Sequence, residues 1–216
     1  MNKYGLAIHT SSPDLGLALS NFEGEFRQQV WNLGREVSNQ MHQILSEFLP
    51  PQTWADLDFI AVATGPGGFT GTRIGVVTAR TLAQQLNRPL FGISSLAAAA
   101  RSAWQYGSQH HDSETCEVTI AIQMPAQRGE LYTAIYQVSS TQSTPLLPDA
   151  VMTPDTWQTL LSTWSTPYQR IEAAAQQGEH VASILDLANL QRNQGARSTW
   201  DTVLPFYGQH PVSRLD

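Results

Sequence analysis

The sequence has few of the residues from which catalytic and nucleic-acid-binding sites are usually built. Lys3 is the only lysine and Cys116 the only cysteine, and charged residues make up 14% of the 216 positions, with a net charge of −6. A single cysteine excludes an internal disulfide and a cysteine metal site. The shortage of basic residues argues against an extended nucleic-acid surface, but it leaves open RNA binding through a partner.

Long apolar runs are missing as well. No stretch is long enough to span a bilayer, and the first residues lead directly into a strand pattern without a signal peptide. Hydrophobic residues make up 41% of the chain, which is typical of a globular protein. These features predict a soluble, cytoplasmic protein that makes no contact with a membrane.

Motifs of catalysis are also absent. The six histidines include no H-x-x-x-H pair, and no G-x-S-x-G elbow supports a serine nucleophile. His110 and His111 lie in a polar stretch, where a solvated surface pair is expected, and Cys116 begins a strand pattern, where a buried thiol is expected. We therefore expect no catalytic residue, no metal site and no cofactor.

The most informative stretch that is present is residues 64–75 (TGPGGFTGTRIG), between an apolar segment and a helical pattern. Glycines at a strand-to-helix junction permit sharp turns and close backbone approach. A P-loop does not fit, because Thr70 or Thr72 stands where its second glycine is required and no lysine follows; a dinucleotide motif fails at Thr70. The stretch is either an unusual phosphate cradle or a tight turn that sets a close-packed helix. The loop residues are Gly65, Pro66, Gly67, Gly68, Phe69 and Thr70.

Thr70 is predicted to be the N-cap of the following helix, with Phe69 before the cap and Ile74 after it forming a hydrophobic staple. A ridge of small residues then recurs every four positions along the helix. A glycine inside a helix costs about 1 kcal/mol relative to alanine, so the ridge predicts that something packs closely against it. That neighbour is either a partner helix or the core of the chain itself. The ridge consists of Gly71, Gly75, Ala79 and Ala83.

The two halves of the chain repeat one order of elements, β-β-β-α-β-α. In the first half we predict strands over residues 4–9, 15–20, 25–31, 59–63 and 89–93, and helices over 37–48, from Thr70, and after a cap at Ser94 or Ser95. In the second half we predict strands over 117–124, 130–138 and 168–173, a loop over 139–148 that returns as a weak strand, and helices from Thr153 and over 181–192. The repeat predicts two related lobes, residues 1–105 and 106–216, with the last segment packing back on the first lobe.

Residues 65–75 resemble the GPGSFTGLRIG signature of the TsaB family. Three further segments match in the family's order: LAIHTS at 6–11 (family LAIDTS), GISSL at 92–96 (GVSSL) and RGELY at 128–132 (xGEVY). The match covers the first hundred residues well and the second half thinly. The resemblance implies an α/β, two-lobed fold of the actin, Hsp70 and sugar-kinase type (ASKHA), in which each lobe is a mixed sheet with helices.

The resemblance also implies a function. Members of the TsaB family are non-catalytic subunits required to form N6-threonylcarbamoyladenosine in tRNA. Each pairs through helices with the catalytic transferase TsaD, which uses a metal and threonylcarbamoyl-AMP, and the ATPase TsaE joins the pair. Contact with tRNA is made only through this complex, and the oligomeric state of the free protein, a homodimer or not, stays open. The expected partner contacts are Ser38, Met41, His42, Leu45, Gly71, Arg73, Ile74, Gly75, Thr78, Ala79, Arg80 and Ala83.

Four positions depart from the family pattern. His9 stands where the first strand usually ends in Asp, and Pro125 falls where a second phosphate-loop acid is expected. Val37 replaces a common histidine, and Gln209 replaces an arginine. A neutral imidazole supplies neither the charge nor the hard oxygen ligands that a metal–phosphate group requires. These departures argue against the main alternative, a nucleotide-dependent phosphotransferase of the sugar-kinase type; a third alternative, a peptidase, has no nucleophile–base pair to support it.

Overall fold

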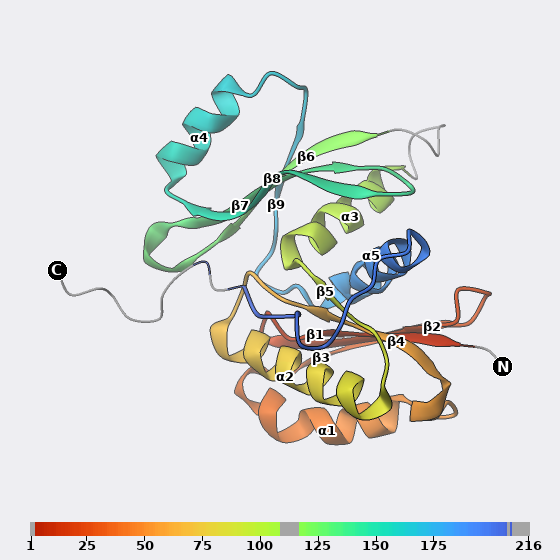
Figure 1. Cartoon of the computed structure of the whole chain (residues 1–216). Helices are drawn as coiled ribbons and strands as arrows, with labels where there is room; N and C mark the ends of the chain where they lie inside the picture. Colours follow the sequence, from red (N-terminus) through yellow and green to blue (C-terminus); the bar gives the residue numbers. More distant parts are fainter. Residues whose placement is uncertain (1–2, 109–116, 207, 209–216) are drawn as a thin grey trace.

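The computed structural model describes residues 3–108, 117–206 and 208 and consists of two mixed sheets with helices between and outside them (Figure 1). The predictions for His110, His111, Cys116 and Gln209 lie outside the described residues. Among the described residues, no helix has both the length and the apolar character needed to cross a membrane.

The first sheet has five strands in the order β3-β2-β1-β4-β5. β2 pairs antiparallel with β1 and β3, whereas β4 pairs parallel with β1 and β5. Helices α1 and α2 cover one face, and α5 covers the other (Figure 1). Because both faces are covered, β1 and β2 are buried along their whole length and read as apolar runs. The elements are β1 (Tyr4–His9), β2 (Asp14–Ser20), β3 (Phe26–Asn32), β4 (Leu57–Ala63), β5 (Leu90–Ile93), α1 (Val37–Phe48), α2 (Phe69–Leu86) and α5 (Val181–Asn193).

The second sheet has four strands in the order β8-β7-β6-β9, which repeats the order of the first four strands of the first sheet. Its inner face contacts α3, and Trp157 and Leu161 of α4 pack on its outer side. The repeated order confirms the α/β class and the two related sheets expected from the sequence. The elements are α3 (Ser95–Ser108), β6 (Val118–Pro125), β7 (Leu131–Val138), β8 (Ser143–Met152), α4 (Pro154–Thr163) and β9 (Gln169–Glu172).

The predicted loop over residues 139–148 is wrong for most of its length, because β8 begins at Ser143. Pro145 and Pro148 disfavour a strand, since proline cannot donate to a neighbouring strand. β8 tolerates them because it is an edge strand whose pairing with β7 shifts register on either side of Ile135.

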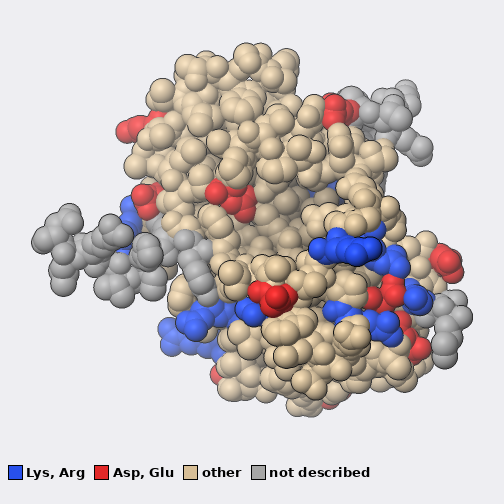
Figure 2. All heavy atoms as spheres, viewed as in Figure 1, with Lys and Arg blue, Asp and Glu red and all other residues tan. Residues whose placement is uncertain are grey.

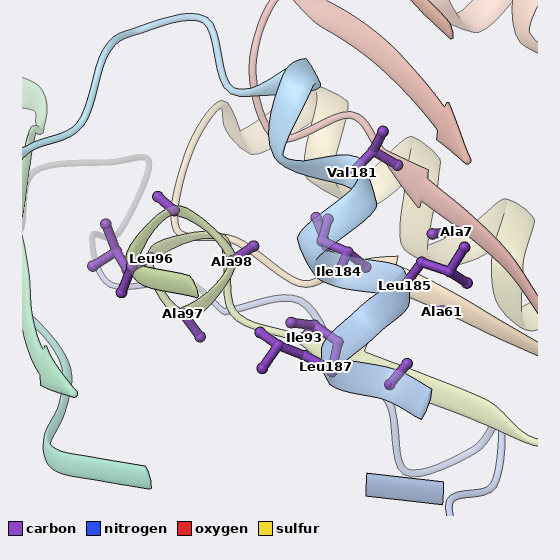
Figure 3. Close-up of a cluster of buried hydrophobic side chains, with 14 of the residues drawn as sticks. Ala7, Ala61, Ile93, Leu96, Ala97, Ala98, Val181, Ile184, Leu185 and Leu187 are labelled. Atoms are coloured by element: carbon purple, nitrogen blue, oxygen red, sulfur yellow. The ribbon is translucent and has the colours of Figure 1, made fainter. Parts of the chain in front are cut away.

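The main core lies between the two sheets and contains two helices, each of which packs on the sheet formed by the other half of the chain. α3 comes from the first half of the chain but contacts β6 and β7, and α5 comes from the second half but contacts β1, β2 and β4. Figure 3 shows Leu185 of α5 beside Ala7 of β1, and Leu187 of α5 beside Ile93. Alanine on the sheet lets the helix approach closely, so small side chains here fix the spacing of the two layers.

Hydrogen bonds of polar side chains connect the end of β5 with the second sheet. Ser94, which precedes α3, donates to the Asp149 carboxylate of β8 over 2.5 Å, and Tyr136 of β7 donates to the same carboxylate over 2.6 Å. Burial raises the pKa of Asp149. Arg101 of α3 forms an ion pair with Asp186 of α5 at 2.7 Å. The bonds to Asp149 hold the junction of β5 and α3 against the second sheet, and the ion pair joins α3 to α5.

Two helix starts that were predicted from the sequence are confirmed. Ser94 Oγ accepts hydrogen bonds from the N–H groups of Leu96 and Ala97, at 3.1 and 3.2 Å, so it caps α3. Thr153 accepts from the N–H of Thr156, and a proline occupies the first position of α4. Both caps satisfy N–H groups that have no partner inside the helix.

Candidate functional site

The glycine-rich loop packs against the chain's own β1–β2 turn. Gly65 and Gly67 have φ of +94° and +156°, which favour glycine. A Cβ at Gly67 would lie 2.1 Å from the carbonyl oxygen of Ser11, and the N–H of Gly68 donates to that oxygen over 2.6 Å. Of the two interpretations of this loop, the geometry favours the tight turn, because protein backbone occupies the space that the glycines open.

The predicted cap at Thr70 is wrong. α2 begins at Phe69 with Gly68 as its N-cap, so the staple that placed Phe69 before the cap is wrong too. Thr72 donates its hydroxyl to the Gly68 carbonyl over 2.9 Å, and its N–H donates to the same oxygen. The extended backbone of Gly68 therefore starts the helix two residues earlier than the sequence predicted.

The ridge of small residues on α2 faces inward, so its prediction as a partner contact is wrong. A Cβ on Gly71 would lie 2.2 Å from the Thr10 carbonyl oxygen, and one on Gly75 would lie 2.1 Å from Thr10 Oγ1. Thr10 Oγ1 also donates to the Gly71 carbonyl over 2.8 Å. Ala79 and Ala83 are fully buried in the core between α2 and the sheet. The ridge permits close packing within the first lobe, which was the other neighbour left open by the sequence.

Two of the predicted partner contacts on α1 are also buried in the chain's own core. Met41 is 0% exposed and Leu45 is 3% exposed, and both belong to the core under the first sheet. They are therefore unavailable to a partner. Ser38 and His42 lie on the exposed side of the same helix and stay candidates.

What the two helices do expose is an outer face that points away from the sheet (Figure 1). Val77 is 60% exposed in the middle of α2, so it offers apolar surface on this side of the helix. Exposed α2 residues include Arg73 but no acid, since α2 contains no Asp or Glu. We call the following set the outer face: Ser38, His42, Arg73, Ile74, Val77, Thr78 and Thr81.

The two arginines of α2, Arg73 and Arg80, each lie over an aromatic ring of the same chain. The Arg73 guanidinium lies 5.4 Å from the centre of the Phe69 ring, and that of Arg80 lies 5.8 Å from the Trp200 ring. Arg80 thereby links α2 to the segment that follows α5. Figure 2 shows that most Lys and Arg side chains on the viewed side gather in the lower part of the view, where Figure 1 places the first sheet and its helices.

A cleft of about 910 Å³ opens between the glycine loop, the β1–β2 turn and the β6–β7 turn. Among its described lining residues, Arg35 is the only charged one, and none is a carboxylate. Pro125 lies in this lining at the position where a phosphate-loop acid was expected. Magnesium is held in proteins mainly by carboxylate and carbonyl oxygens, so this lining does not fit a metal–phosphate group.

His9, at the end of β1, is fully buried and does not line the cleft. Neither ring nitrogen has a hydrogen-bond partner among the described residues. Burial, and secondly the nearby His180, lower the pKa of His9 to about 3. The imidazole is therefore neutral at physiological pH and cannot replace an acid that holds a metal.

The stability of the protein is expected to depend on pH through His9. Between about pH 6.5 and 3 the unfolded chain binds a proton that the folded chain excludes, so the free energy of unfolding should fall as the pH is lowered through this window. One such group contributes at most about 1.4 kcal/mol per pH unit. Urea unfolding at pH 7, 6, 5 and 4 measures this dependence, and His9→Leu should flatten it, whereas His42→Leu on the exposed side of α1 should not. An equal slope in the His9→Leu variant would contradict the assignment.

Comparisons with known proteins agree with this fold. A family model described as TsaD, tRNA N6-adenosine threonylcarbamoyltransferase, matches residues 36–198. Two proteins described as tRNA threonylcarbamoyladenosine biosynthesis protein TsaB are also similar in sequence. The one from Bacillus subtilis is 32% identical over 167 residues, 75% of this chain and 67% of that protein. The one from Escherichia coli is 31% identical over 134 residues, 61% of this chain and 54% of that protein.

The solved structure of YeaZ from Pseudomonas aeruginosa has the same fold. It superposes with a TM-score of 0.77 over 95% of this chain and 99% of that one, at 22% sequence identity. The match with the family model over most of the chain and the identity with the Bacillus subtilis protein together show that this chain belongs to the TsaB family, within the group that the TsaD model recognises.

Proposed function

We propose that this chain is a non-catalytic subunit required to form N6-threonylcarbamoyladenosine in tRNA in the cytoplasm. It pairs with a TsaD-like transferase and activates it, a TsaE-like ATPase joins the pair, and tRNA is contacted only through the complex. The observation that carries the proposal is the similarity to two bacterial TsaB proteins, which covers 75% and 61% of the chain.

The inter-lobe cleft supports the non-catalytic part of the proposal. An enzyme of this architecture that transfers a phosphoryl group needs charge to hold a metal and phosphates. Here the first strand ends in the buried, neutral His9, and the cleft is lined by Pro125 and by one cation, Arg35. The absence of a carboxylate among the described lining residues also argues against the alternative, a sugar-kinase-type phosphotransferase.

The outer face of α1 and α2 is the surface we assign to the transferase. The exposed Val77 suits the centre of a contact between helices, because burying it removes apolar surface from water. Arg73 lies on the same face and favours a partner with an acidic side chain opposite it. A second copy of the chain would use the same face, so homodimer formation and transferase binding exclude each other in this proposal.

Reconstitution tests the proposal. The TsaD-like and TsaE-like proteins of the same cell are incubated with tRNA, threonine, bicarbonate and ATP together with the enzyme that supplies threonylcarbamoyl-AMP, and modified adenosine is measured by mass spectrometry. We expect modification only when this chain is present, and no ATP turnover by this chain alone. Full modification without the chain would refute a required subunit, and ATP turnover by the chain alone would refute the non-catalytic role.

A further inference from the structure

A second pocket, of about 450 Å³, lies at the opposite end of the first sheet from the glycine loop. It is bounded by the β2–β3 turn, by the starts of β1 and β4, and by the last turn of α5. Its volume falls within the range of roughly 300–1,000 Å³ that is usual for small-molecule sites. We call it the hairpin pocket; its lining residues are Lys3, Asn21, Phe22, Glu23, Asp58, Phe59, Asn189, Arg192 and Asn193.

One wall of the hairpin pocket is an aromatic ring that the turn holds at the surface. The Phe22 ring stacks on the buried Phe59 ring with centroids 6.0 Å apart and planes inclined by 17°, yet Phe22 is 41% exposed. Its φ is +60°, a left-handed conformation that bulky residues rarely adopt. Asn21 Oδ1 stabilises the turn by accepting from the N–H groups of Glu23 and Glu25, at 2.9 and 3.0 Å. A rigid turn therefore presents a flat apolar surface to whatever enters the pocket.

The opposite side of the pocket carries amide groups with free hydrogen-bonding capacity. Asn189 and Asn193 lie four residues apart in α5, so both side chains can face the same space. Within the part of the chain that the structure describes, neither side chain has a hydrogen-bond partner. A carboxamide offers a donor and an acceptor side by side, which matches the paired acceptor and donor on the edge of an adenine ring.

The charges around the pocket cancel. Lys3 Nζ lies 3.2 Å from Asp58 Oδ1, and Arg192 forms an ion pair with the other oxygen of the same carboxylate. With Glu23, the lining holds two cations and two carboxylates, so its net charge is zero. Both cations already have a partner and the pocket offers no excess positive charge to a phosphate, which favours a neutral ligand.

We propose that the hairpin pocket binds a purine nucleoside, with the base stacked on the exposed face of Phe22 and its edge hydrogen-bonded by Asn189 or Asn193. A flat, neutral ring system can stack on the Phe22 ring, and a donor and an acceptor on its edge can bind the amide of Asn189 or Asn193. The base has two sources, a free nucleoside or an unpaired base of an RNA strand. This inference does not depend on the proposed pairing with a transferase, because none of the lining residues of the pocket belongs to α1 or α2.

Isothermal titration calorimetry of the whole chain with adenosine tests the proposal. We expect millimolar or tighter binding, and at least about tenfold weaker binding to Phe22→Asn, because base–aromatic stacking is lost. Asparagine tolerates the left-handed conformation, so this variant keeps the turn. The matched control is Phe26→Asn, since Phe26 is 57% exposed on the neighbouring strand but does not line the pocket; its affinity should equal that of the unaltered chain.

Titrations with AMP and with single-stranded hexaadenylate separate the two sources of the base. AMP should bind no more tightly than adenosine, because the pocket has no net charge. Tighter binding of hexaadenylate with the same loss in Phe22→Asn would identify RNA as the source, and preference for adenosine would identify the free nucleoside; both support the site. No binding of adenosine or hexaadenylate at millimolar concentration, equal affinity of Phe22→Asn, or a preference for AMP would overturn it.

Discussion

Replacing Gly71 with alanine is expected to lower the free energy of unfolding of the isolated protein by about 3 kcal/mol. The added Cβ would lie 2.2 Å from the Thr10 carbonyl oxygen, which is backbone and cannot rotate away, so α2 or the β1–β2 turn must move. Overpacking of a close contact typically costs about 1–3 kcal/mol, and the hydrogen bond from Thr10 Oγ1 to Gly71 would be strained as well. Urea unfolding followed by circular dichroism measures the change.

The control is the same substitution at Gly107. That glycine also lies in a helix, α3, but a Cβ there would meet nothing within 4 Å. Gly107→Ala should therefore leave stability unchanged or raise it by about 0.4–1 kcal/mol, because alanine reduces the entropy of the unfolded chain. If Gly71→Ala lost no more stability than Gly107→Ala, the contact between α2 and Thr10 would not be tight.

Replacing Val77 with glutamate is expected to weaken association with the TsaD-like partner by at least about 30-fold while leaving the chain folded. Val77 is 60% exposed in the free chain, so the substitution costs little there. In a contact between helices, the unpaired carboxylate would lose its hydration, at a cost of about 2 kcal/mol or more. Titration calorimetry with the purified partner measures the loss.

Thr159→Glu is the matched control, because Thr159 is exposed on α4, on the outer side of the second sheet. It introduces the same charge and should leave the affinity unchanged. Arg73→Glu should also weaken binding, whereas Arg80→Glu is a poorer probe because Arg80 packs on Trp200 within the chain. Equal affinities of Val77→Glu and Thr159→Glu would place the partner elsewhere.

Local patterns in the sequence predicted much of the fold. The bounds of β1 and α1 agree with the prediction residue for residue, because a short apolar run and helical spacing are both properties of neighbouring residues. The caps at Ser94 and Thr153 were found for the same reason. β8 was largely missed, because the disfavoured prolines become acceptable only when a strand lies at the edge of a sheet.

The orientation of α2 could not be predicted from its pattern. Helical spacing groups Gly71 with Gly75, but apolar residues lie on both sides of the helix, so the spacing does not say which side turns inward. The deciding contact is with Thr10, 61 residues from Gly71 in the chain. The hairpin pocket was missed for the same reason, since Lys3, Phe22 and Arg192 meet only through the arrangement of the sheet and α5.

Amide hydrogen exchange of this chain, measured with and without the TsaD-like partner, tests the assigned docking surface most directly. We predict that protection on binding is concentrated in peptides of α1 and α2, and that α4 and the hairpin pocket exchange as they do in the free chain. Protection confined to the second lobe, or no change in either helix when the partner is bound, would contradict the assignment of the outer face as the contact that activates the transferase.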